Sequence, residues 1–165
     1  MRPLQSPLLH QCEIFGCRPM VIMLLCLAVG LAATRRVGAQ EVVPRELVVI
    51  VNPANPVNSL GKDFIRRVFL KKLTRWDNDE TIRPVDLSAK SEVRWLFCVR
   101  VLERSIDAVK SYWQQRIFSG RDIPPPELAS EEAVVDYVKR YPGAIGYVSK
   151  ATNLVGTKVL TVNPN

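Results

Sequence analysis

The stretch PVDLSAKSEVRWLFCVRV, residues 84–101, has the pattern of a strand end, a polar turn and the start of a helix. An apolar run over residues 82–87 precedes the turn at residues 88–91. Apolar residues then recur at helical spacing, at Val93, Leu96, Phe97 and Val101. A helix that begins directly after a strand leaves backbone N–H groups free to bind an anion. The stretch therefore predicts an α/β fold and the position of a candidate anion site.

Four side chains around this turn are candidate ligand-binding residues. Ser88, Lys90 and Ser91 lie in the turn itself, and Arg94 lies near the start of the expected helix. Hydroxyl groups and cationic side chains are common partners of an anion held at a helix N-terminus. Ser91 also has a simpler interpretation, because a serine before a helix caps the first turn through its hydroxyl. The pattern therefore predicts a helix start at Ser91, with or without a ligand.

The N-terminal segment has the pattern of an export signal. Basic residues precede an apolar run over residues 20–33, and small residues follow up to Ala39. This order predicts a signal peptide at residues 1–39 and a periplasmic or otherwise exported protein. Arg35 and Arg36 lie between the apolar run and the expected cut. They leave open two other possibilities: a later true start of the chain, or a segment that is not cleaved and anchors the protein to the membrane.

Composition limits the chemistry that the chain can carry. The 165 residues have a formal net charge of +7, but the basic residues are scattered, so we expect no nucleic-acid partner. His10 is the single histidine and would leave with the signal peptide. Without a histidine, the remaining segment lacks a catalytic triad or a typical zinc site, so we expect no enzyme, metal or cofactor. Cys98 would be the remaining cysteine, and its apolar neighbours favour burial over a reactive thiol.

The rest of the chain alternates expected strands with expected helices. Apolar runs predict strands at residues 47–51, 82–87, 144–148 and 158–162. Serines placed before apolar stripes of helical spacing predict helix starts at Ser59, Ser91, Ser105 and Ser130. Strands separated by helices are typical of a mainly parallel sheet flanked by helices. We therefore expect a single α/β domain over residues 40–165.

Two short motifs carry a family resemblance. In the first, a Val-Phe pair is followed by lysine and then tryptophan, at Val68, Phe69, Lys71 or Lys72, and Trp76. The second, Pro-Gly-Ala-Ile-Gly-Tyr-Val, spans residues 142–148. Together they resemble the phosphate-binding proteins of bacterial ABC importers, in the type II periplasmic binding protein superfamily. That family has a glycine before the first lysine and an asparagine at the position of Tyr141. The resemblance covers about residues 46 to 150.

The resemblance implies the fold of a single lobe of these two-lobed proteins, and binding of phosphate or another small anion for an ABC importer. The family holds phosphate partly through an arginine and a Ser-Gly-Thr turn at a helix start. Here the turn falls on Ser91, Glu92 and Val93, so only the serine is kept. The second lobe is missing, which implies that an importer or envelope protein, or self-association, completes the cleft. The alternative is a ligand-free interaction module of a cell-envelope or transport assembly.

Overall fold

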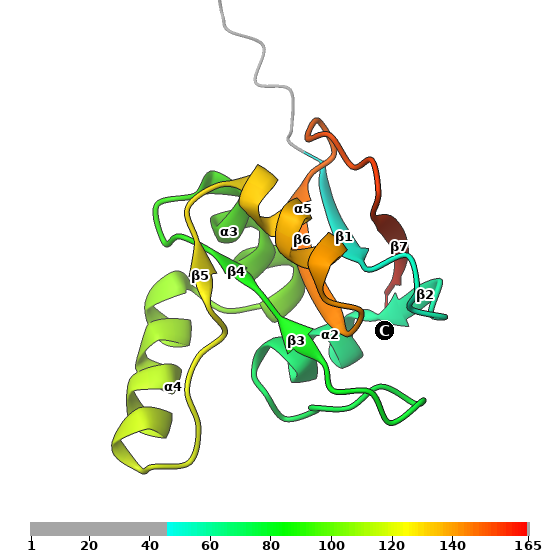
Figure 1. Ribbon diagram of the computed structural model, residues 1–165. Coiled ribbons are helices and arrows are strands. Elements are labelled where there is room, and N and C mark those ends of the chain that lie inside the picture. Colours follow the sequence, from blue (N-terminus) through cyan, green and yellow to red (C-terminus); the bar gives the residue numbers. More distant parts are fainter. Residues whose placement is uncertain (1–45, 165) are drawn as a thin grey trace, which may run out of the picture. The chain divides into compact units, whose positions relative to one another are not determined.

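The computed structural model describes residues 46–164, so the signal peptide expected at residues 1–39 lies outside the described residues. A five-stranded sheet runs through this part of the chain (Figure 1). In spatial order its strands are β2 (Ser59–Gly61), β7 (Lys158–Asn163), β1 (Leu47–Val51), β6 (Ala144–Ser149) and β3 (Arg83–Pro84). The strands expected at residues 47–51, 144–148 and 158–162 are confirmed to within one residue.

The central strand β1 is antiparallel to both of its neighbours. Val49 pairs with Tyr147 of β6 on one side and with Leu160 of β7 on the other. β3 runs parallel to β6, and β2 runs parallel to β7. The expected α/β class is confirmed, but the sheet is mixed rather than mainly parallel. The parallel expectation assumed crossovers between successive strands, whereas β1 pairs with two strands that are distant in sequence.

The strand expected at residues 82–87 is divided between two sheets. β3 pairs with β6, whereas β4 (Asp86–Leu87) pairs with β5 (Glu127–Leu128) in a separate two-stranded parallel sheet. The change of partner occurs at Val85, whose N–H still donates to the carbonyl of Ile145 in β6. The N–H of Asp86 then donates to Pro126. One continuous apolar run therefore contributes a strand to each of two sheets.

Serine caps determine where three of the four described α-helices begin. The helices are α2 (Lys62–Phe69), α3 (Glu92–Phe97), α4 (Ile106–Phe118) and α5 (Glu131–Arg140), and the π-helical segment η1 (Cys98–Leu102) continues α3. Ser91, Ser105 and Ser130 each accept a hydrogen bond from the third residue of the helix that follows. Ser59 was expected to cap α2 but lies in β2, because residues 59–61 pair with β7 before the helix begins.

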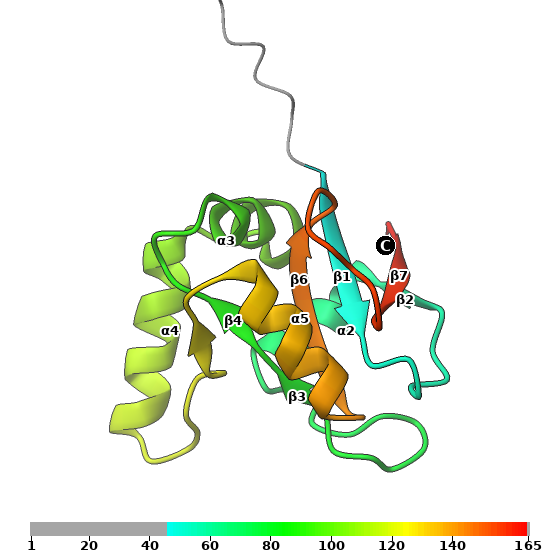
Figure 2. The same cartoon turned by 45° about the horizontal axis from the view of Figure 1, so that its top comes forward.

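Helices cover both faces of the sheet, and β6 shows how the layers meet (Figure 2). Gly146 faces α5, where an added Cβ would lie 2.6 Å from Val134. The next residue, Tyr147, points to the opposite face because side chains alternate along a strand. Its ring stacks on Phe97 of α3 with centroids 3.8 Å apart, and it also contacts Phe69 of α2. The core of the described chain thus lies on both sides of β1 and β6.

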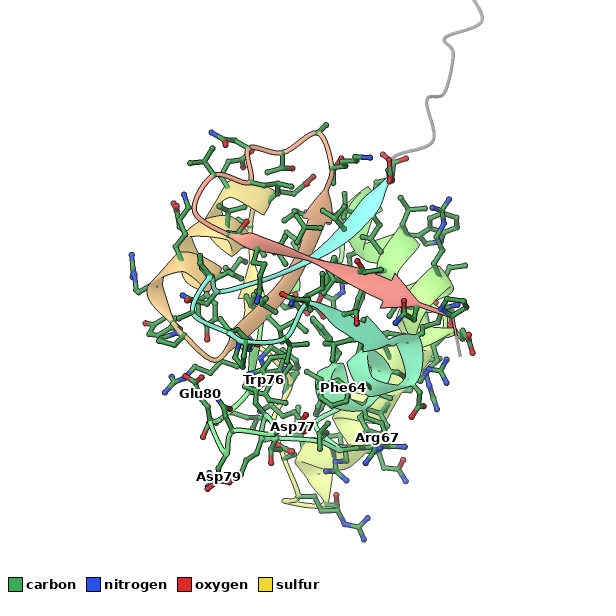
Figure 3. The ribbon with its side chains drawn as sticks, turned by 90° about the vertical axis from the view of Figure 1, so that its right-hand side faces the viewer. Phe64, Arg67, Trp76, Asp77, Asp79 and Glu80 are labelled. Carbon is green, nitrogen blue, oxygen red and sulfur yellow. The ribbon has the colours of Figure 1, made fainter. Side chains whose placement is uncertain are left out.

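Trp76 joins the two motifs that carry the family resemblance. Its indole N–H donates to the carbonyl of Gly143, with the two atoms 3.2 Å apart. Its ring stacks on Phe64 of α2 at 5.9 Å between centroids. Both residues are labelled in Figure 3. Gly143 has no room for a side chain, since an added Cβ would lie 2.1 Å from the backbone oxygen of Thr81. The tryptophan of one motif and the glycine of the other therefore form a single packing unit.

Candidate functional site

The turn singled out by the sequence lines a hollow at the ends of two parallel strands. β4 and β5 run side by side, so the loops that follow them emerge at the same end (Figures 1 and 2). We call the hollow the β4–β5 hollow; it has a volume of about 470 Å³. Ser88, Lys90 and Ser91 line it from the loop after β4, and Ser130 lines it from the loop after β5. Three of the four predicted site residues are therefore brought together.

The two serines of the turn also shape the backbone. The Ser91 hydroxyl accepts a hydrogen bond from the N–H of Arg94 at 3.4 Å, which confirms the helix cap. The backbone N–H of Ser91 donates to the carbonyl of Ser88 at 2.8 Å. The Ser88 hydroxyl accepts from the N–H of Lys90 at 3.5 Å. Because both hydroxyls act as acceptors toward the backbone, their own O–H groups can still donate to an anion.

Carboxylates outnumber cations around the hollow. Glu92, Glu131 and Glu132 line it together with Lys90. Glu131 accepts hydrogen bonds of 2.6 Å from the N–H of Ser149 and from the hydroxyl of Thr152, so part of its charge is satisfied by the protein. The carboxylates repel an anion that enters the hollow, because like charges raise the electrostatic energy. A doubly charged anion is therefore attracted by Lys90 and repelled by the three glutamates.

The pKa of Glu132 shows that this end of α5 stabilises negative charge. Hydrogen bonds from its own backbone N–H and from the Ser130 side chain hold the pKa of the Glu132 carboxyl below its usual range. Donors at a helix N-terminus act in this way on any carboxylate or anion placed there. The positive end of α5 is thus already used by the protein's own carboxylate.

Arg94, the fourth predicted site residue, lies in a buried cluster beneath the hollow and does not line it. Its guanidinium forms ion pairs with Asp86 at 3.1 Å and with Glu127 at 2.6 Å, and it donates to the carbonyl of Leu87 at 2.6 Å. The Arg94 side chain therefore ties α3 to β4 and β5. Its role as a direct ligand stays a prediction, one that requires these ion pairs to open.

Asp86 and Tyr147 complete the buried cluster. The Tyr147 hydroxyl donates to the Asp86 carboxylate, and both residues are buried. Burial raises the pKa of Asp86 even though Arg94 opposes the shift, and burial together with Asp86 raises the pKa of Tyr147. Sequence reasoning missed this cluster. The available signal was the acidic residue between the apolar Val85 and Leu87 of an expected strand.

Cys98 lies beside the same cluster, close to Arg94 and Asp86. Its side chain is buried, as expected, and burial raises the pKa of the thiol to about 11. A thiol with so high a pKa is a poor nucleophile near neutral pH. Cys98 therefore contributes to packing.

No group of three or more histidine, cysteine, aspartate or glutamate residues within residues 46–164 could hold a metal ion. Within the same range, no helix is long and apolar enough to span a membrane.

Comparison with solved structures relates this fold to phosphate receptors. An ABC-type phosphate transport receptor from Vibrio cholerae is similar, with a TM-score of 0.57 at 20% sequence identity. PstS from Borrelia burgdorferi is similar with a TM-score of 0.57 at 14% identity. The alignments cover 72% of this chain and 46% and 47% of those proteins, so the chain spans about half of their length. Among curated protein sequences, none matches the chain significantly.

A family model gives a second and independent comparison. The model is described as a PBP superfamily domain, and it matches residues 29–162. The match includes both motifs, the β4–β5 hollow and the buried cluster beneath it. Because the family match covers most of the chain and the fold agrees with that of phosphate receptors, this chain belongs to the PBP superfamily.

Proposed function

We propose that this protein is an exported solute-binding protein, and that the lobe described here holds phosphate or another small anion in the β4–β5 hollow. The observation that carries the proposal is the convergence of Ser88, Lys90 and Ser91 on this hollow, at a helix start, within a PBP superfamily lobe. Hydroxyl donors, backbone N–H groups and an ammonium group together form the donor set that an anion requires. The fold supports a solute-binding role, and the anion itself is the proposed part.

We expect this binding to be weak in the isolated chain. The hollow is open to solvent, where salt screens charge interactions beyond about 8 Å at physiological ionic strength. The carboxylates of Glu92, Glu131 and Glu132 further reduce the attraction for an anion. A second surface that covers the hollow would exclude water and strengthen every hydrogen bond to the ligand. Such a surface could come from an ABC importer component, from an envelope protein or from a second copy of the chain.

The direct test is thermal unfolding of the full chain with phosphate, sulfate and a dicarboxylate at matched ionic strength. A ligand that binds only the folded state stabilises it by ~2.7 kcal/mol at a hundredfold excess over the dissociation constant. We expect a rise in the unfolding midpoint that Lys90→Ala reduces, because the ammonium group lines the hollow. Lys110→Ala is the matched control, since Lys110 is an exposed lysine of α4 outside the hollow. No rise with any anion would contradict the proposal.

A second candidate function is an interaction module without a ligand. The observation in its favour is the excess of carboxylates in the hollow, together with Glu92 and Val93 at the family's Gly-Thr positions. In this case the hollow would receive a basic segment of a partner protein instead of an anion. Glu132→Gln, which removes a charge that the solvent reaches, should then weaken a stoichiometric complex. The same substitution should strengthen binding if the ligand is phosphate.

The proposal also includes that the protein is exported and that it is not an enzyme. The relatives in the solved structures are phosphate receptors or binding proteins, and such proteins bind without chemical turnover. The segment at residues 1–39 is proposed to direct export, with cleavage after Ala39. N-terminal sequencing of protein recovered outside the cytoplasm tests this cut. A mature chain that still begins at Met1 would favour the membrane anchor.

A further inference from the structure

The C-terminal end of α4 exposes apolar side chains. Phe118 is 90% exposed, Ile123 is 68% exposed and Ile117 is 49% exposed. We call this surface the α4 tip, and define it as residues 117–123. In Figure 1 it lies at the lower left, at the far end of α4 from the loop that joins this helix to η1. Single exposed apolar residues are common, but three within seven positions at a helix end form a patch that suggests a partner.

The α4 tip is held in place by the rest of the lobe. The Tyr112 hydroxyl donates to the carbonyl of Leu70 at 2.8 Å, which fixes α4 to the end of α2. Asp122 forms ion pairs with Lys71 at 3.4 Å and with Arg116 at 3.7 Å. The apolar side chains therefore project from a fixed support.

Basic residues lie near the exposed apolar side chains. Lys71 and Arg116 reach the tip through their ion pairs with Asp122, Lys72 is the exposed chain neighbour of Lys71, and Arg121 belongs to the tip itself. The acidic residue among them is Asp122, which is satisfied by two of these cations. The acidic turn with Asp77, Asp79 and Glu80 lies at the opposite side of the lower edge in Figure 1 and is labelled in Figure 3. The surroundings of the α4 tip are therefore net positive.

We propose that the α4 tip docks on an anionic membrane surface. Phe118 and the two isoleucines would enter the boundary between headgroups and acyl chains, while Lys72 and Arg121 meet lipid phosphates. Apolar side chains combined with a basic rim are the features that hold peripheral proteins on anionic bilayers. The net positive surroundings of the tip match an anionic lipid surface in charge, and its exposed apolar side chains match the acyl boundary of that surface.

This proposal goes beyond solute binding and does not depend on it. The α4 tip lies before β5 in the chain, whereas the β4–β5 hollow follows the C-terminal ends of β4 and β5. A lobe docked through the tip would keep the hollow away from the lipid and open to solute or to a partner. Lys90→Ala should therefore weaken anion binding without changing lipid binding through the tip. Failure of either proposal can be recognised without the other.

The test uses the full chain and a local probe, because the apolar run at residues 20–33 can itself bind lipid. Phe118→Trp places an indole at the tip, and vesicles with brominated acyl chains quench an indole that enters the bilayer. The matched control is Val155→Trp, at a 75% exposed apolar residue before β7. Vesicles of phosphatidylcholine are compared with vesicles that also contain phosphatidylglycerol. Quenching is measured relative to the parent chain, which already contains tryptophans.

We expect added quenching for Phe118→Trp in the anionic vesicles, and none for Val155→Trp. Lys72→Ser and Arg121→Ser should each lower the part of the vesicle partition coefficient that is due to the tip by about fivefold. Added salt should also lower it, because salt screens the attraction between the basic residues and the lipid phosphates. Phe118→Ser should reduce that partition by about tenfold or more. Absence of added quenching at position 118, or equal quenching in neutral and anionic vesicles, overturns the proposal. If Phe118→Ser instead breaks a stoichiometric protein complex, the α4 tip binds a protein and the lipid assignment is wrong.

Discussion

The carboxylate of Asp86 and the guanidinium of Arg94 form an ion pair of 3.1 Å beneath the β4–β5 hollow, with side chains only 11% and 7% exposed. The pair joins the strand before the hollow to the helix after it. Removal of one partner leaves the other charge buried without compensation, which costs far more than loss of a surface pair. Arg94 also donates to the carbonyl of Leu87, which lines the hollow, so the hollow depends on a contact that a ligand need never touch.

Arg94→Ala should lower the free energy of unfolding by ~3–5 kcal/mol, because Asp86 would remain buried without its cation. Urea unfolding followed by circular dichroism measures this loss. Arg66→Ala is the matched control, since Arg66 pairs at 2.8 Å with Glu103, which is 55% exposed. That more exposed pair should contribute about 1 kcal/mol or less. Equal losses for the two variants would contradict the role of the buried pair.

The contribution of Asp86 to the free energy of unfolding should decrease as the pH rises, because the pKa of Asp86 is raised in the folded protein. Burial raises the pKa of Asp86 in the folded protein, so unfolding releases its proton between the unfolded and folded pKa values. Its contribution to the free energy of unfolding is then full below about pH 3.9 and is lost as the pH rises through the folded pKa. The stability of the parent minus that of Asp86→Asn should therefore fall with rising pH. A difference that grows with pH would mean that Arg94 lowers the pKa of Asp86 by more than burial raises it.

Asp122 at the α4 tip provides a control of opposite sign. Burial is the largest single influence and raises its pKa, but the Ile123 N–H and the charges of Lys71 and Arg116 together outweigh burial, so the pKa of Asp122 is lowered. Its stabilising contribution is present above the unfolded pKa and is lost as the pH falls through the folded pKa. The stability of the parent minus that of Asp122→Asn should therefore rise with pH. Equal slopes for Asp86→Asn and Asp122→Asn would contradict the assignment.

Two aromatic residues of α4 should respond very differently to truncation. Trp113 is 5% exposed and lies in the core, so Trp113→Ala should cost ~3–5 kcal/mol of unfolding free energy. Phe118 is 90% exposed, and Phe118→Ala should change stability by less than about 0.5 kcal/mol. Thermal or urea unfolding of the two variants checks both values. A large loss for Phe118→Ala would mean that its side chain packs against the lobe, which would also weaken the membrane-docking proposal.

Gly146 sits where β6 passes under α5. An added Cβ would lie 2.6 Å from Val134 and 3.1 Å from Val85, both of which are buried and cannot swing away. Gly146→Ala should therefore cost ~1–3 kcal/mol through overpacking. Gly146→Ala combined with Val134→Ala should recover part of that loss, because the second substitution removes the clashing methyl groups. No recovery in the double variant, measured by urea unfolding, would place the strain elsewhere.

Cys98 should be protected from alkylation in the folded protein. Burial raises the pKa of its thiol to about 11, so both the thiolate fraction and solvent access are low near neutral pH. Reaction with iodoacetamide, followed at this position by peptide mass spectrometry, should be slow in buffer and fast in denaturant. Arg94→Ala should accelerate the reaction if it loosens the cluster beside Cys98. Rapid labelling of the parent chain in buffer would show that the thiol is accessible.

Local patterns were sufficient for much of the fold. The strands at β1, β6 and β7 are short apolar runs, and their positions follow from hydrophobicity alone. Three of the four expected serine caps are confirmed, because a cap depends on residues within one turn. Ser59 failed for a tertiary reason, since its segment pairs with β7 across the sheet. The order and direction of the strands likewise depend on distant partners that local pattern does not encode.

The candidate site was predictable at the level of the loop and not at the level of contacts. Ser88, Lys90 and Ser91 meet in one hollow because they are neighbours in sequence. The carboxylates of α5 line the same hollow because β4 and β5 pair in parallel. Strands of only two residues have too short a pattern for this pairing to be predicted from the sequence. Arg94 has the spacing of a ligand residue, but a buried aspartate across the turn determines where its guanidinium lies.

β1 leaves the ribosome before either of the strands between which it will lie. Val49 cannot complete its pairing until Tyr147 and finally Leu160 have been synthesised, so no stable sheet can form around the nascent strand. Pairings of such long sequence separation form slowly, because the loop between the partners must close first. The newly made chain therefore remains loose for most of its synthesis. Under the export proposed above, that delay would leave the chain unfolded for passage through a membrane channel, and the sheet would form on the far side.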